Sequence, residues 1–179
     1  MMAGMGEPRV ELGASEPGDP GGVATVEPTD DDDAGFDELY RREYAPMLRL
    51  ASLLVDAREQ AEEVVHDAFA KVYERWGKLD RPGAYLRTCV VNRSRDVQRR
   101  RRFERGGKSG DGDASSDLGA AELLDALAKL PSRQRAALVL RYYEDLPEAD
   151  IAEVLGVRPG TVKSLVSRGL DQLREVVER

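Results

Sequence analysis

Apolar side chains recur every three or four residues in two stretches of the chain, residues 36–104 and 121–178. This spacing is typical of amphipathic helices that pack through one apolar face. The segment between the stretches, RGGKSGDGDASSDLGA, has few apolar residues and many Gly, Ser and Asp. We therefore predict an all-α fold class with two small helical domains, residues 36–104 and 121–179, joined by a flexible linker at residues 105–120.

The first 35 residues are acidic and rich in Gly and Pro, with nine Asp and Glu against a single Arg. Large apolar side chains are almost absent, so burial cannot offset the entropy of ordering this segment. We predict a disordered acidic tail at residues 1–35. The tail also conceals a basic segment: the whole chain has a net charge of −7, although residues 81–105 contain nine Arg against two acids.

Three helices are predicted in the first domain. The first contains Pro46 and is therefore either one helix or two helices joined there. The second, at about residues 61–76, has apolar side chains on one face and charged side chains on the other. After a short loop, the third begins at about Ala84.

This third helix has one apolar and one cationic face. A rotation of 100° per residue puts Leu86, Cys89, Val90 and Val97 in one arc. The opposite side has almost no acids, and Arg pairs bidentately with phosphate oxygens, so we favour phosphate binding over an ordinary solvated face. The residues on this cationic side are Arg87, Ser94, Arg95, Gln98, Arg101 and Arg102.

The second domain ends in two helices with a tight connection. A short apolar helix precedes Gly156, and Pro159 stands where the first residue of the last helix belongs. This spacing is typical of a helix-turn-helix, with a bare helical hairpin as the alternative, and it places Val162, Val166 and Leu170 on the packing face. The outward residues are all hydrogen-bond donors: Arg158, Thr161, Lys163, Ser164, Ser167, Arg168 and Arg174.

Composition argues against several other classes. With one Cys (Cys89) and one His (His66), the chain can form neither an internal disulfide nor a thiolate/imidazole zinc site. No apolar run reaches the length of a membrane span, and the acidic start lacks the features of a secretory signal, so we expect a cytoplasmic protein. No nucleophile with a base, metal set or phosphate loop is apparent, and we therefore predict no enzymatic activity, metal or cofactor.

Three strings, in this order, resemble motifs of the extracytoplasmic-function (ECF) group of bacterial RNA polymerase sigma factors. AEEVVHDAFAKVYERW is similar to the second conserved region, and PGAYLRTCVVNRSRD to the helix that follows it. YYEDLPEADIAEVLGVRPGTVKSLVSRGLDQLR is similar to the fourth region, especially in the sigma-E-like actinobacterial branch. The resemblance covers about residues 36–177.

The resemblance implies a subunit that binds core RNA polymerase and directs promoter-specific initiation without chemistry of its own. The first domain would correspond to region 2 and the second to region 4. In the family, the polar side of the region 2 helix grips the polymerase, which nominates Glu62, Glu63, His66, Asp67, Lys71 and Arg75. The −10 element would face Lys78, Asp80, Arg81, Arg87, Asn92, Ser94, Arg95, Gln98, Arg101 and Arg102.

By the same resemblance, the −35 element would face the outward residues of the last helix, Arg158 to Arg174. An anti-sigma factor is an expected partner, and the protein is expected to be monomeric outside the holoenzyme. Leu165 stands where the family usually has a polar residue, which makes this helix less cationic than is typical. The alternative function is a stand-alone helix-turn-helix regulator that acts without polymerase, usually as a symmetric dimer.

Overall fold

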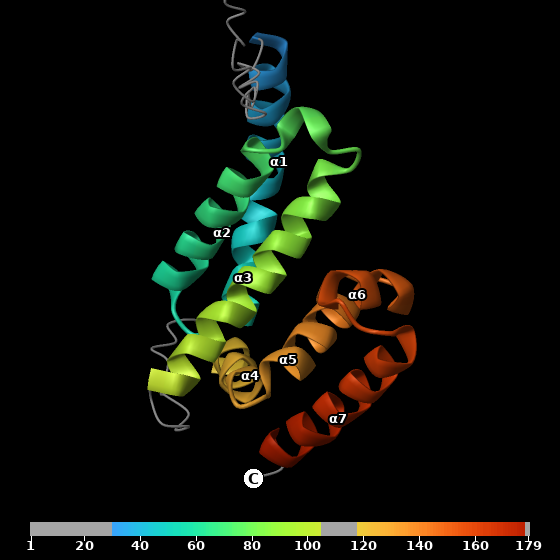
Figure 1. The fold of residues 1–179 in the computed structure, drawn as a ribbon. Helices are drawn as coiled ribbons and strands as arrows, with labels where there is room; N and C mark the ends of the chain where they lie inside the picture. The colour runs from blue at the N-terminus through green and yellow to red at the C-terminus, as the bar shows by residue number, and fades with distance from the viewer. Residues whose placement is uncertain (1–29, 105–117, 178–179) are drawn as a thin grey trace, which may run out of the picture.

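In the computed structural model, residues 30–104 and 118–177 are described, and within these ranges every regular element is helical (Figure 1). The all-α prediction is confirmed. The predictions for residues 1–29 of the acidic tail and 105–117 of the linker lie outside the described residues. Helix α1 begins at Asp30 and α4 at Leu118, so the predicted tail and linker each extend too far into helical sequence. Acids in a first turn favour helix formation through the helix dipole, which explains the early start of α1.

The first domain is a bundle of three helices, α1 (Asp30–Leu54), α2 (Arg58–Tyr73) and α3 (Pro82–Glu104). Helix α1 runs unbroken through Pro46, which resolves the one-or-two-helix alternative. Its neighbours Met47 and Leu50 are fully buried, so packing on α2 and α3 offsets the local cost of the proline. The 3-10 turn η1 (Trp76–Lys78) leads from α2 towards α3.

Four helices and a π-helical turn form the second domain. Helix α4 (Leu118–Ala128) is followed by α5 (Ser132–Leu138), the π-helix η2 (Val139–Tyr143), α6 (Glu148–Leu155) and α7 (Pro159–Val177). Helix α7 lies so close to α5 that a Cβ on Gly169 would be 2.9 Å from Leu138 Cδ1. This close approach fixes the position of α7 on the rest of the domain.

The two domains pack against each other, which the sequence did not predict. Helix α3 contacts α5 and α6, and α1 contacts α4 and α5 (Figure 1). Buried side chains of both domains belong to one continuous apolar cluster. Leu53 of α1 also packs against Leu127, Leu130 and Leu138 of the second domain. The described structure is therefore a closed arrangement of the two domains.

Candidate nucleic-acid and polymerase interfaces

Helix α2 presents its polar face outward because its apolar face forms the domain core. Val64, Val65 and Phe69 on the inner side are at most 3% exposed. The residues proposed for polymerase binding are exposed or half-buried, and all but Arg75, which follows the end of α2, lie on the other side of this helix: Glu62, Glu63, His66, Asp67, Lys71 and Arg75. The predicted polar face of α2 is therefore the one that the structure leaves open.

Three acids of this face are held by arginines. Arg93 Nε donates to Asp67 Oδ2 at 2.7 Å, and Arg93 Nη2 donates to Glu63 Oε1 at 3.1 Å. Arg58 Nε donates to Glu62 Oε1 at 3.0 Å. Since Arg93 belongs to α3, it fixes two carboxylates of α2 relative to the neighbouring helix. Sequence analysis did not nominate Arg93, although its position in the basic segment was a usable signal.

Around the loop that follows α2, Lys78, Asp80 and Arg81 are exposed. Trp76 packs edge-on against Phe36, with ring centroids 5.4 Å apart, as expected for a core side chain. Tyr85 is also packed against the core, and burial raises the pKa of its hydroxyl. The guanidinium carbon of Arg75 lies 5.7 Å from the centroid of the Tyr85 ring.

On α3, the predicted cationic side divides into residues that are covered and residues that are open. Arg87 Nε donates to Glu144 Oε2 of the second domain at 2.6 Å. Arg95 is half-buried, and its pKa is lowered by burial and, to a lesser extent, by the like charge of Arg133. Gln98 Nε2 donates to the Leu54 carbonyl oxygen at the end of α1.

The remaining residues of that side differ in exposure. Asn92 is exposed and Arg101 is half-buried. Ser94 is 0% exposed, so its prediction as an outward DNA-binding residue is wrong. Ser94 lies inside the cationic arc, between Arg101 and Arg87, and the helices packed around α3 cover that part of the arc. The Arg102 side chain lies outside the described residues.

Arg135 on α5 is the largest side chain that the structure buries fully, at 1% exposure. Its Nε donates to the Leu53 carbonyl at 2.6 Å, its Nη2 to the Val55 carbonyl at 2.9 Å and its Nη1 to Asp56 Oδ1 at 2.9 Å. Burial lowers the pKa of this guanidinium, and Asp56 opposes that effect. Together with Gln98, Arg135 satisfies the Leu53, Leu54 and Val55 carbonyls at the end of α1. Sequence analysis missed this residue.

The turn before α7 has the geometry that the helix-turn-helix prediction requires. Gly156 has a left-handed conformation with φ of 62° and ψ of 42°. The Val157 N–H donates to the Ala152 carbonyl at 3.0 Å, and the Gly156 N–H to the Glu153 carbonyl at 3.2 Å. This pair of bonds is the Schellman arrangement, which ends α6 and redirects the chain into α7.

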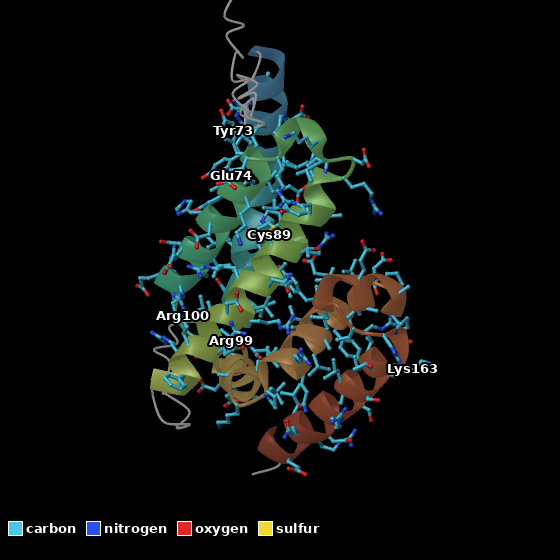
Figure 2. The ribbon with its side chains drawn as sticks, in the orientation of Figure 1. Tyr73, Glu74, Cys89, Arg99, Arg100 and Lys163 are labelled. Carbon is cyan, nitrogen blue, oxygen red and sulfur yellow. The ribbon has the colours of Figure 1, made fainter. Side chains whose placement is uncertain are left out.

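The outward face of α7 is open to solvent. All seven nominated residues from Arg158 to Arg174 are exposed, and Lys163 is visible on the outer edge of the molecule (Figure 2). Leu165 is only 7% exposed, so the residue that departs from the family pattern belongs to the packing face. Leu170, which was assigned to that face, is 37% exposed instead. Gly169, the preceding residue, contacts α5 in its place.

Among the described residues, no group of three or more His, Cys, Asp and Glu side chains is arranged to hold a metal ion. Within the same part of the chain, no helix is sufficiently long and apolar to cross a membrane. The features that stand out are therefore three polar or cationic surfaces: the outer face of α2, the loop with the cationic side of α3, and the outer face of α7.

Residues 39–104 match the family description "Sigma-70 region 2", and residues 120–173 match "Sigma-70, region 4". The RNA polymerase sigma-E factor of Streptomyces avermitilis is 34% identical over 152 residues, which cover 80% of this chain and 85% of that protein. The ECF RNA polymerase sigma factor SigE of Mycolicibacterium smegmatis is 34% identical over 184 residues, which cover 92% of this chain and 71% of that protein.

A solved structure shares the fold. The sigma factor RpoE of Bartonella quintana, determined in complex with the anti-sigma factor NepR, has a TM-score of 0.66 at 23% identity, covering 80% of this chain and 97% of that chain. The two matched regions coincide with the two helical domains, and their order is that predicted from the motifs. The chain therefore belongs to the ECF family of RNA polymerase sigma factors, in its sigma-E-like group.

Proposed function

We propose that this protein directs promoter-specific transcription initiation by binding core RNA polymerase and recognising the −10 and −35 elements. The observation that carries the proposal is the exposed donor face of α7, presented behind the Gly156 turn within the match to region 4. Such a helix enters the major groove with its outward side chains against bases and phosphates. The protein acts in the cytoplasm, where polymerase and promoter meet, and it contributes no catalytic chemistry of its own.

The outer face of α2 is assigned to polymerase binding. Its acids and bases are exposed or half-buried, and Arg93 holds Glu63 and Asp67 in fixed positions. Preformed side-chain geometry reduces the entropy lost on association. The polymerase is therefore expected to meet an ordered charged surface here rather than flexible side chains.

The loop at Lys78–Arg81 and the cationic side of α3 are assigned to the −10 element. Separation of the DNA strands at this element exposes a single strand. Cationic side chains bind its phosphates, and pockets or stacking surfaces hold its bases. Lys78 and Arg81 are exposed, while Arg87 and Arg95 have neighbours in the second domain. Ser94 is left out of this assignment because it is buried.

An anti-sigma factor is proposed as a regulatory partner. The support is the family membership and the likeness of fold to the Bartonella quintana sigma factor, which was determined with its anti-sigma factor. A pull-down with the products of neighbouring genes tests this partner. Failure to recover any binding protein that also lowers transcription would count against it.

Run-off transcription with bacterial core enzyme on a promoter library tests the function. The wild-type chain should support initiation at a defined subset of promoters. Arg168→Glu should change which promoters are used, because it reverses an exposed charge on α7. Arg95→Glu should reduce initiation at every promoter. Arg41→Glu is the matched control for Arg168→Glu, because Arg41 is also an exposed arginine but lies on α1 outside the three surfaces.

A folded protein that leaves core enzyme unable to initiate anywhere would overturn the proposal. Binding to palindromic duplexes as a dimer, without any effect on polymerase, would favour the stand-alone regulator instead.

A further inference from the structure

The last turn of α3 carries an aromatic side chain that takes no part in the core. Phe103 is 90% exposed, more than any other large apolar side chain of the described residues. It follows four consecutive arginines, Arg99 to Arg102, and no acid lies between Val97 and Phe103. A single exposed apolar residue is common and needs no explanation. An exposed ring beside a run of cations, however, combines the two kinds of side chain that bind single-stranded nucleic acids.

Helical geometry places two of these arginines beside Phe103. Arg99 and Arg100 precede it by four and three residues, which are the spacings at which side chains of a helix are neighbours. Both arginines are exposed, and Figure 2 shows them near the end of α3, on the opposite side of the view from Lys163 of α7. The ring and the two guanidinium groups therefore form one patch that is open to solvent.

The same side of α3 carries Asn92, which is already assigned to the −10 element. A rotation of 100° per residue puts Asn92, Arg99 and Phe103 within about 40° of each other. All three are exposed. By contrast, Arg87 and Gln98 lie on another side of the helix and donate hydrogen bonds to other parts of the chain. The stripe from Asn92 to Phe103 is therefore a side of α3 that the structure leaves open.

One acid, Asp96, lies beside this stripe and pairs with Arg99. Asp96 Oδ1 is 3.2 Å from Arg99 Nη2, and the two side chains are 52% and 80% exposed. An exposed pair of this kind contributes little to stability, so Arg99 can exchange the carboxylate for a phosphate at small cost. Phe103 supplies a face on which a base can stack. Because the bases of a duplex already stack on one another, the nucleic acid that fits this patch is a single strand.

We propose that the exposed end of α3 is a single-strand binding site, in which Arg99 and Arg100 bind phosphates and Phe103 stacks on an unpaired base. The strand is DNA separated at the −10 element, because Asn92 on the same stripe is assigned to that element. This source of the strand rests on the proposed function. The stacking and phosphate contacts rest only on the exposure and spacing of the three side chains.

Four variants separate these contacts. Phe103→Ala removes the ring, and Phe103→Leu keeps an apolar side chain without an aromatic face. Because Phe103 is 90% exposed, neither variant should change the free energy of unfolding in urea denaturation. Arg99→Gln removes one proposed phosphate contact. Arg41→Gln is its matched control, because Arg41 also forms an exposed ion pair within its own helix, with Asp37 of α1.

Fluorescence anisotropy of a labelled mixed-sequence DNA strand of about 12 nucleotides measures binding to the full-length chain without polymerase. Phe103→Ala and Phe103→Leu should each bind at least about fivefold more weakly than wild type, because stacking requires the ring. Arg99→Gln should make the slope of log affinity against log salt shallower by about 0.7, and Arg41→Gln should change neither quantity. Phe103→Trp should bind like wild type, and the strand should quench the fluorescence of the added indole.

Wild-type strand affinity in Phe103→Ala would overturn the site, and wild-type affinity in Phe103→Leu would overturn stacking. Duplex DNA whose binding depends equally on Phe103 would contradict the unpaired base, and tighter binding of RNA of the same sequence would contradict a DNA strand. If Phe103→Ala weakened only the binding of core polymerase, the patch would be a protein contact. Failure of the proposed function has a different signature: wild-type protein would be inactive in run-off transcription while strand affinity still depended on Phe103.

Discussion

Gly169 is the position where one methyl group should most clearly disturb the second domain. A Cβ there would lie 2.9 Å from Leu138 Cδ1 and 3.1 Å from Leu138 Cγ. Leu138 cannot move away freely, because it is 3% exposed and packed with Leu127 and Leu130. Overpacking of this kind costs about 1–3 kcal/mol, and Ala recovers up to about 1 kcal/mol of helix propensity over Gly. Gly169→Ala should therefore lower the free energy of unfolding by about 1 kcal/mol.

The matched control is Gly160→Ala in the same helix, where an added Cβ meets nothing within 4 Å. This variant should be neutral or slightly stabilised. Urea denaturation followed by circular dichroism at 222 nm compares both variants with wild type. Adding Leu138→Val to Gly169→Ala should restore part of the loss, because it removes Leu138 Cδ1, the nearest atom that the new methyl meets. If Gly169→Ala is as stable as Gly160→Ala, the close approach of α7 to α5 is refuted.

Three further variants or reagents test other features of the fold. Gly156→Ala places a side chain at a φ of 62° and should lower the free energy of unfolding, measured by urea denaturation, by about 1 kcal/mol. An unchanged free energy of unfolding would contradict the left-handed turn. Leu165→Arg buries a charge on α7 and should lower the free energy of unfolding by more than about 3 kcal/mol. A folded variant of wild-type stability would show that this position is not in the core. Burial raises the pKa of the Cys89 thiol, so the thiolate fraction at pH 8 is smaller in the folded protein than in the unfolded chain. Iodoacetamide, which reacts with the thiolate, should therefore label Cys89 slowly until urea is added. Equal labelling rates with and without urea would contradict this burial.

Most of the local structure could be predicted from the sequence because it depends on residues close together in the chain. The three-to-four spacing of apolar residues predicts the helices and which face of α2 is outward. Gly156 and Pro159 predict the turn and the start of α7. The motifs in their order also predict the family, and the matches to regions 2 and 4 confirm it.

Periodicity was less reliable about which outward positions other helices cover. Ser94 and Leu170 were each assigned to the wrong side, because a 100° rotation groups residues by direction and does not show which neighbouring helix packs there. In α7 the close contact at Gly169 determines which apolar residues turn inward, and the spacing alone contains no information about it.

The chain's own pattern thus determined its helices, its family and most of the residues on its three candidate surfaces, because each follows from residues within one or two turns of each other. In the sequence, Arg135 is indistinguishable from the other charged residues of its helix. Only the tertiary structure shows that it is buried against the end of α1, some 80 positions earlier in the chain. The physical reason is that a buried guanidinium requires acceptors on every side, and its acceptors come from another domain. The packing of the second domain on the first likewise determines that Arg87 faces Glu144, whereas Lys78 and Arg81 face solvent.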